Sequence, residues 1–259
     1  MAALAPTLVT ATPHAEQAWN ARQLAEPVTE PRLRLWTYRA PGVVFGCSQR
    51  ALHERTALAD RAVVRGSGGG AVLTGPWMLS ASIVLPPDHA LLSSGPIGSY
   101  RWLGVLHAGL LRDMGIAAFA LPPEQARSHQ ADAALTWACY GGLSPWEVVV
   151  DSRKIVGLAQ LRRRTGVLLT SGTLIAPPDW RLLCEALGQP AGLGDALADR
   201  TTSCETELGA PVIAEVLADR LHHMLTDVLG SMAANDHEPM PRASIRHATR
   251  PRGAAAPPG

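Results

Sequence analysis

WEVVVDSRKIVGLAQLRRRTGVLLTSGTLI, from Trp146 to Ile175, contains three apolar runs separated by two short polar segments. The runs are rich in Val, Ile and Leu, which favour strands. Residues 151–152 and 164–166 carry the Asp, Ser, Thr and Gly that are typical of turns. Because short turns join antiparallel neighbours, the segment predicts an antiparallel meander, with Lys154 at the start of its second strand.

Apolar periodicity predicts further strands and helices on both sides of this meander. The segments 32–38 and 43–46 are predicted strands, and Pro41 with Gly42 lies between them, so we expect a hairpin there. The chain is therefore expected to be an α+β domain with a mixed, largely antiparallel sheet flanked by helices. Further strands are expected on both sides of the glycine-rich stretch 65–70 and over 78–86, and helices at 14–25, 99–114, 180–187 and 211–230.

The composition is that of a soluble globular protein. The chain has 259 residues, of which 47% are hydrophobic and 17% charged, and a net charge of +1. This balance gives no electrostatic reason to expect nucleic acid or a membrane as partner, and no apolar run approaches the roughly 18 residues of a membrane span. Four cysteines without metal spacing, and no signal peptide, suit the cytoplasm. We expect an irregular start over 1–13, one domain over 14–232 and a disordered tail over 233–259.

Lysine occurs once in the chain. Lys154 is the exception among 23 basic Lys and Arg residues. Its ammonium is a compact point charge on a flexible stem, which can follow an anionic oxygen in a way that a planar guanidinium cannot. Lys154 is therefore a candidate for chemistry, although a single lysine surviving by chance in an Arg-biased sequence gives the same composition.

A glycine cluster lies between two predicted strands. The stretch RGSGGGAV, from Arg65 to Val72, has three consecutive glycines, which weaken strand pairing and allow another group to approach the main chain. Such a loop can direct several N–H groups at an anion, and it can equally be a bulge or a wide turn. It is neither a P-loop nor a dinucleotide fingerprint, because no Gly-Lys-Ser/Thr follows and no helix begins directly after it.

These motifs, taken in order, resemble a known family. RGSGGGAV, RKIVGLAQLRR and GVLLTSGTLI, with VVFGCSQR upstream and TTSCETELG downstream, are similar to the catalytic domain shared by lipoate-protein ligases, octanoyltransferases and biotin-protein ligases. The similarity covers roughly residues 14–230. It implies the fold of that catalytic domain and an enzyme that attaches a lipoyl or octanoyl group to a specific lysine. The acceptor would be a lipoyl-carrier domain of a 2-oxoacid dehydrogenase or the glycine cleavage H protein.

The first mechanism that the resemblance implies is that of a ligase. ATP, with Mg²⁺, and free lipoate or octanoate would form an acyl-adenylate, which the carrier lysine then attacks. Lys154 in RKIVG matches the catalytic lysine of the family and would neutralise the developing negative charge. No metal ligand is assigned. The residues expected to bind substrate and nucleotide are Arg65, Ser67, Gly68, Gly69, Gly70, Ala71, Gly157, Ala159, Gly172 and Thr173.

The alternative mechanism is that of a Cys-dependent octanoyltransferase, which needs no cofactor. Cys139 in WACYGGLSPWEVVV lies at the place where such enzymes carry the cysteine that accepts the acyl group from an acyl-carrier protein as a thioester. An ammonium nearby, from Lys154, would favour the reactive thiolate. A buried structural cysteine is the other interpretation of Cys139.

Several positions depart from the ligase pattern. A single Arg65 follows Val64 where the ligases carry two arginines, and LSPWE replaces the Asn-Asp pair that helps hold Mg²⁺ and nucleotide. Ser171 occupies the position of a frequent histidine. These departures motivate a second alternative, a non-catalytic regulator that binds acyl groups or the carrier domain.

Overall fold

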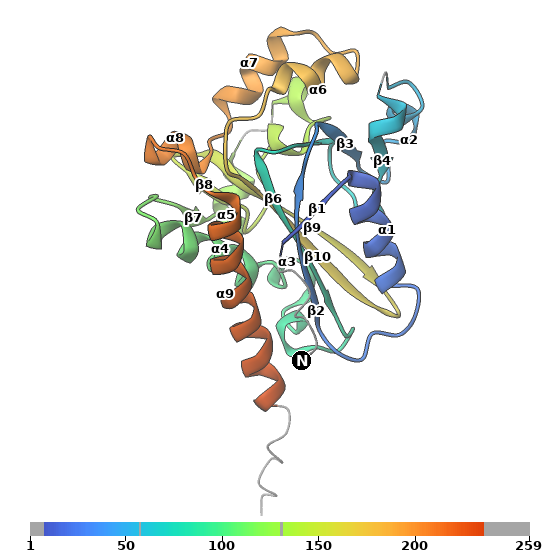
Figure 1. The fold of residues 1–259 in the computed structure, drawn as a ribbon, viewed down its shortest axis with the longest axis vertical. Helices are drawn as coiled ribbons and strands as arrows, with labels where there is room; N and C mark the ends of the chain where they lie inside the picture. The colour runs from blue at the N-terminus through green and yellow to red at the C-terminus, as the bar shows by residue number, and fades with distance from the viewer. Residues whose placement is uncertain (1–7, 57, 130–131, 236–259) are drawn as a thin grey trace, which may run out of the picture.

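The computed structural model describes residues 8–56, 58–129 and 132–235, which form an α+β fold with a large and a small sheet (Figure 1). Within the described residues, all pairings of the large sheet except that of its first two strands are antiparallel, so the expected fold class is confirmed. The small sheet has the order β4 (Ala62–Val64), β3 (Gly42–Phe45), β5 (Val72–Thr74). The large sheet has the order β1 (Leu8–Ala11), β2 (Arg32–Tyr38), β6 (Met78–Leu85), β10 (Gly166–Leu174), β9 (Arg153–Arg163), β8 (Val148–Val150), β7 (Phe119–Ala120).

The predicted meander is present as β8, β9 and β10. Asp151 and Ser152 join β8 to β9 with φ angles of 47° and 70°, the left-handed conformations that a tight type I′ hairpin requires. Lys154 pairs with Val149 across this hairpin. It therefore lies on the second strand of the meander, directly after the turn, as expected.

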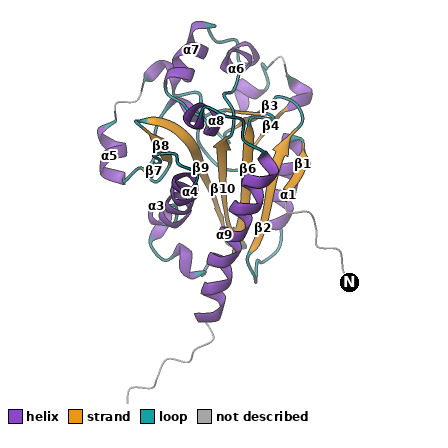
Figure 2. Ribbon diagram, turned by 60° about the vertical axis from the view of Figure 1, so that its left-hand side comes forward, coloured by secondary structure: helices purple, strands orange, loops and turns teal. Residues whose placement is uncertain are grey.

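Two apolar cores cover opposite faces of the large sheet. Because side chains alternate along a strand, Leu169 of β10 belongs to one core and Leu168 to the other. The helices α4 (Arg101–Asp113) and α9 (Ala214–Asn235) cover the first face, and α9 crosses in front of the sheet in Figure 2. The second face is covered by the small sheet and by α1 (Pro13–Gln23), α6 (Trp180–Ala186) and α7 (Gly192–Asp199). The remaining helices are α2 (Arg50–His53), α3 (Gly95–Gly98), α5 (Pro123–Ser128) and α8 (Cys204–Leu208).

Three expectations of the sequence analysis differ from the structure. β2 and β3 do not form a hairpin, because β2 pairs with β1 and β6 while β3 joins the small sheet. The expected irregular start contains β1, which extends the large sheet. The helix α9 runs to Asn235, into the segment expected as a tail, while residues 1–7 and 236–259 lie outside the described residues.

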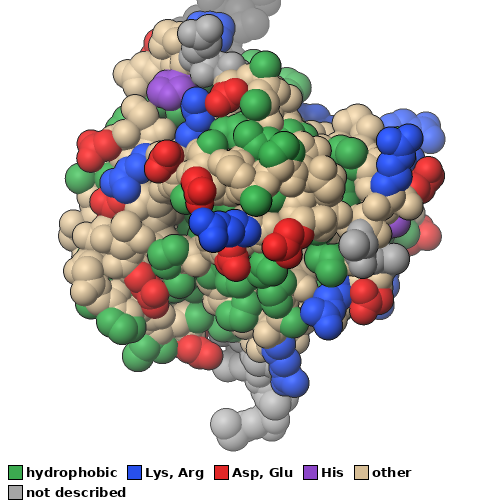
Figure 3. Space-filling view, turned by 90° about the horizontal axis from the view of Figure 1, so that it is seen from above, with side chains coloured by type: hydrophobic (Ala, Val, Ile, Leu, Met, Phe, Trp, Pro, Cys, Tyr) green, Lys and Arg blue, Asp and Glu red, His purple; other side chains and the backbone are tan. Residues whose placement is uncertain are grey.

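The surface carries charges of both signs. On the face seen in Figure 3, basic and acidic side chains are interspersed, and apolar side chains lie between them. Among the described residues, no helix combines the length and the apolar character that crossing a membrane needs.

A buried histidine links α4 to β10. His107 is 1% exposed, and its Nε2 lies 2.9 Å from Oγ of Ser171, at the position where the family often carries a histidine. Burial lowers the pKa of His107 from 6.5 to about 4. The imidazole is therefore neutral in the folded protein at neutral pH.

We expect this histidine to make stability depend on pH. Between its unfolded pKa of 6.5 and its folded pKa of about 4, the unfolded chain binds more protons, so its contribution to stability is lost as pH falls through this range. Between pH 7 and pH 5 the loss amounts to about 2 kcal/mol. Urea unfolding of wild type and His107→Gln at both pH values measures it. An equal pH dependence in the two proteins would contradict the assignment.

Candidate functional site

A buried ion pair joins β9 to the segment before β8. Nζ of Lys154 lies 2.7 Å from Oε2 of Glu147, and the two side chains are 1% and 2% exposed. The same ammonium donates to the backbone carbonyl of Cys139 at 2.7 Å and lies 5.4 Å from the centre of the Tyr140 ring. The only lysine of the chain is therefore fixed directly behind Cys139.

The carboxylate of this pair is held from several sides. Backbone N–H groups of Ser144 and Leu158 donate to Glu147 at 2.7 and 3.3 Å. Burial raises the pKa of Glu147, and Lys154 together with these amide hydrogen bonds counteracts part of the rise. The negative charge on Glu147 is therefore favoured by the ammonium beside it, and the two groups act as a unit.

The backbone before Glu147 is strained. Trp146 has a φ of 68°, which is unfavourable for a bulky residue. Its carbonyl oxygen lies against α4, where a Cβ at Gly104 would come within 2.1 Å of it. The helix thus needs glycine at this point, and the close contact holds the segment that delivers Glu147.

Arg65 fixes the glycine loop. It is 7% exposed, and its guanidinium donates to the carbonyls of Gly68 at 2.7 Å and Gly70 at 2.9 Å. It also donates to the carbonyl of Val44 at 3.1 Å and to the hydroxyl of Ser67 at 3.0 Å. Because its donors are directed at the loop, Arg65 holds the main chain in place, and its charge remains at the base of the loop.

The glycine loop is bonded directly to the segment that carries Cys139. The N–H of Ala71 donates to the carbonyl of Trp137 at 2.7 Å, and the N–H of Cys139 donates to the carbonyl of Ala71 at 2.9 Å. A Cβ at Gly70 would lie 2.6 Å from the backbone N of Cys139. Only glycine therefore allows these two segments, distant in the sequence, to approach so closely.

Two glycines on neighbouring strands make room for Tyr140, the residue after Cys139. Gly157 of β9 stands opposite Gly172 of β10. A Cβ at Gly172 would lie 3.0 Å from the Tyr140 hydroxyl, and one at Gly157 would lie 3.4 Å from it. The hydroxyl donates to the carbonyl of Gly172 at 2.6 Å. The ring is thus seated on the sheet, which fixes the chain at Cys139.

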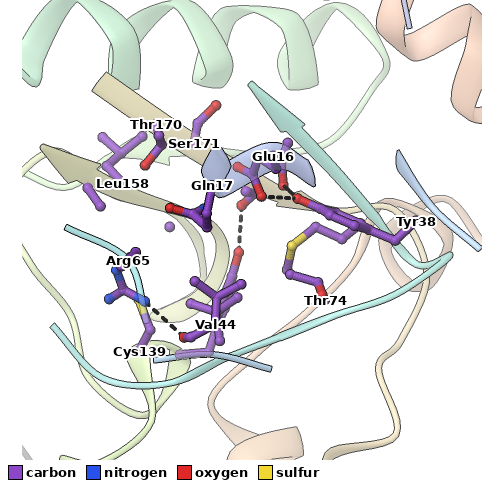
Figure 4. A pocket seen from close by; sticks show the side chains of 17 residues that line it. Glu16, Gln17, Tyr38, Val44, Arg65, Thr74, Cys139, Leu158, Thr170 and Ser171 are labelled. Atoms are coloured by element: carbon purple, nitrogen blue, oxygen red, sulfur yellow. Dashed lines mark hydrogen bonds between the residues drawn. The ribbon is translucent and has the colours of Figure 1, made fainter. Parts of the chain in front are cut away.

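Two pockets meet at Cys139. The first lies between the large and the small sheet and contains about 490 Å³ of empty space, part of it open to solvent (Figure 4). The second is wider, with about 1210 Å³ that includes open solvent, and its wall contains the glycine loop. Cys139 is partly exposed and lines both pockets. The other residues that line both are Arg65, Leu158 and Ala159.

Most of the predicted binding residues lie on the walls of these pockets. Lys154 lines neither pocket, because it lies behind Cys139. Thr173 lies on the opposite face of the sheet, 3.5 Å from Nδ1 of His107, and Ser67 lines a neighbouring pocket behind the glycine loop. Ala71 contributes through its backbone. The predicted residues on the walls are Arg65, Gly68, Gly69, Gly70, Cys139, Gly157, Ala159 and Gly172.

Sequence reasoning gave no role to four further polar residues at the site. Glu147 lies in the quoted stretch WACYGGLSPWEVVV, and its pairing with Lys154 emerges only when β8 and β9 pair. Glu16, Tyr38 and Ser80 come from three separate elements and line the first pocket. The sequence gives no signal that Glu16 is buried, because an acidic residue on a helix is usually exposed to solvent. Its burial depends on tertiary packing.

The donors at the site do not suit a divalent cation. Across the described residues, no group of three or more His, Cys, Asp or Glu side chains could hold a metal ion. Glu147 is the one acidic residue on the wall of the second pocket, and its carboxylate is bound to Lys154. Among its described lining residues, the second pocket therefore offers no carboxylate free of an ion pair.

Comparison with known proteins connects this architecture to one family. The model of the lipoyl protein ligase A/B catalytic domain matches residues 10–224. Octanoyltransferase LipM of Kyrpidia tusciae is 34% identical over 215 residues, covering 78% of this chain and 76% of the relative. Octanoyltransferase LipM of Symbiobacterium thermophilum is 31% identical over 192 residues, covering 70% and 69%.

Solved structures share the fold at low sequence identity. A crystal structure of lipoate-protein ligase A bound with ATP has a TM-score of 0.61 and 19% identity, covering 88% of this chain and 86% of that one. A putative lipoate protein ligase from T. acidophilum with bound lipoic acid also has a TM-score of 0.61, with 18% identity and coverage of 86% and 83%. At this identity the structures establish the fold.

Proposed function

This chain belongs to the family of lipoyl protein ligase A/B catalytic domains and is an enzyme of protein octanoylation or lipoylation, and from this premise we propose that it is a Cys-dependent acyltransferase. It would move an octanoyl or related medium-chain group from an acyl-carrier protein to a lysine of a lipoyl-carrier domain. The relatives named octanoyltransferase LipM favour this alternative over the ATP-dependent ligase, which the sequence analysis placed first.

The position of Cys139 at the junction of two pockets carries this proposal. The acyl chain would occupy the first, narrower pocket, and the second would admit first the donor thioester and later the acceptor lysine. The Cys139 sulfur attacks the carbonyl of the donor thioester, a new S–C bond forms, and the carrier thiol leaves with the proton. The amine of the acceptor lysine then attacks, forms the amide and releases Cys139 as its thiol.

Lys154 would support this reaction from behind the nucleophile. Its ammonium bonds to the Cys139 carbonyl and to Glu147, which uses two of its three N–H groups. The positive charge behind the Cys139 backbone would stabilise, through space, the negative charge that develops as the acyl carbonyl is attacked.

The partners proposed for this reaction are proteins that present flexible arms. The acyl donor is an acyl-carrier protein, and the acceptor is the lipoyl-carrier domain of a 2-oxoacid dehydrogenase or the glycine cleavage H protein. Both the donor thioester and the acceptor lysine have to reach Cys139 from solvent. The wide second pocket, lined by Gly68, Gly69 and Gly70, provides such an approach.

Mass spectrometry tests the proposal. After mixing with octanoyl-acyl-carrier protein in the absence of ATP, we expect a covalent octanoyl adduct, located by peptide mapping on Cys139 and discharged by adding a lipoyl-carrier domain. Pyrophosphate release that requires ATP and free lipoate, without an adduct, would instead support the ligase. If neither signal appears and binding of the acyl group or carrier is retained, the protein is a regulator.

A further inference from the structure

A buried cluster of polar side chains lies across the first pocket from Cys139. It consists of Glu16 of α1, Tyr38 of β2 and Ser80 of β6, which are 5%, 2% and 5% exposed. All three line the pocket. Figure 4 shows Cys139 and Arg65 on one side of the pocket and Glu16 and Tyr38 on the other. The pocket therefore has a nucleophile near one end and hydrogen-bonding groups near the other.

The three groups form a directed chain of hydrogen bonds. The Tyr38 oxygen lies 2.8 Å from Oε2 of Glu16 and 3.0 Å from Oγ of Ser80. A phenol has one proton, so when Tyr38 donates to Glu16 the Ser80 hydroxyl has to donate to Tyr38. Burial is the main cause that raises the pKa of Glu16. The protonated carboxyl that burial favours is a donor as well as an acceptor.

Contact between this polar cluster and a plain alkyl chain is unfavourable. The rest of the pocket wall includes Val44, Val72, Met78 and Leu158, which suit methylene groups. A methyl group that reaches the cluster excludes water from polar atoms without replacing its hydrogen bonds. A ligand with a heteroatom at that point restores a hydrogen bond, which is worth about 1 kcal/mol.

We propose that Glu16, Tyr38 and Ser80 bind a hydrogen-bonding heteroatom at the far end of the acyl chain. The preferred substrate is then a medium-chain acyl group that ends in a hydroxyl or in a disulfide ring, and an unsubstituted octanoyl group is accepted less well. This inference rests on the proposed acyltransferase function and specifies its substrate class. The two end groups share the ability to accept a hydrogen bond, with sulfur the weaker acceptor.

Competition between acyl donors tests the inference. Octanoyl, 8-hydroxyoctanoyl and lipoyl thioesters of the same carrier are mixed in equal amounts with the protein, and the adducts on Cys139 are quantified by mass spectrometry. We expect the wild type to favour at least one of the substituted chains by about fivefold. A preference for the hydroxyl identifies an oxygen ligand, and a preference for lipoyl identifies the disulfide ring.

Three variants connect the preference to the cluster. Glu16→Leu is expected to bring the ratio of substituted to unsubstituted adducts near one, while Glu16→Gln keeps part of the preference because its amide still forms hydrogen bonds. Tyr38→Phe removes one oxygen at constant shape and serves if Glu16→Leu does not fold. Thr74→Val is the matched control, because Thr74 lines the same pocket with its hydroxyl bonded to the Gly42 carbonyl at 3.1 Å.

The outcomes separate this inference from the function on which it rests. If no acyl adduct forms with any donor, the acyltransferase function and the inference both fail. If adducts form and octanoyl is taken up as well as the substituted chains, only the inference fails. It also fails if a preference exists and neither Glu16→Leu nor Tyr38→Phe changes the ratio relative to Thr74→Val.

Discussion

Replacing Cys139 with serine is expected to slow octanoyl transfer by at least about a thousandfold. The hydroxyl of serine is a poor nucleophile unless a base removes its proton. Lys154, whose ammonium bonds to the Cys139 carbonyl, is a hydrogen-bond donor engaged with that carbonyl and with Glu147. An ammonium carries no lone pair to accept a proton, so it cannot activate a hydroxyl. Steady-state transfer to a lipoyl-carrier domain measures the loss.

The chain offers a matched control for this substitution. Cys47 is exposed and lies close to the glycine loop, where its N–H donates to the carbonyl of Ser67 at 2.9 Å. Cys47→Ser removes a thiol at the edge of the same region and is expected to leave the transfer rate unchanged. Transfer that survives in Cys139→Ser and disappears in Cys47→Ser would contradict the assignment of the nucleophile. Thermal unfolding of both variants checks that each remains folded.

The meander was predictable because its signals are local. The turn at Asp151 and Ser152 and the strands on either side of it are contiguous in sequence, so pattern and turn chemistry agree. The expected hairpin of β2 and β3 was wrong for the opposite reason. The strand β2 pairs with β6, more than forty residues later in sequence, as the partners Trp36 and Ser80 show. A turn such as Pro41–Gly42 can equally lead the chain from one sheet to another.

The same distinction applies to the site. The order of the glycine loop, Cys139 and Lys154 along the chain identified the region, because each motif is local. The arrangement around them depends on packing. Lys154 lies behind Cys139 rather than on a pocket wall. This position follows from the pairing of β8 with β9 and from the packing of Tyr140 against two glycines. Neither feature has a periodic signal in the sequence.

The second large effect is expected from Lys154→Arg, which keeps the charge and changes its shape. We expect transfer to fall by about a hundredfold to a thousandfold, the range seen when a group that stabilises developing negative charge is lost, because the guanidinium cannot take the place of the ammonium behind Cys139. The side chain is 1% exposed, so the larger guanidinium has to displace Glu147 or the Tyr140 ring. The overpacking is expected to cost about 1–3 kcal/mol of stability. Full activity in this variant would contradict the role of Lys154.

A pair of further variants separates catalysis from stability at this lysine. Lys154→Met leaves the buried Glu147 without its partner, which is expected to lower the free energy of unfolding by about 3–5 kcal/mol. The double variant Lys154→Met/Glu147→Gln removes both charges, so most of that loss should return, while transfer stays as low as in Lys154→Met. Urea unfolding and transfer rates of the two variants test this. If the double variant recovered transfer as well as stability, the ammonium would serve folding alone. A purely structural lysine can be replaced by any pair of residues that leaves no unpaired buried charge.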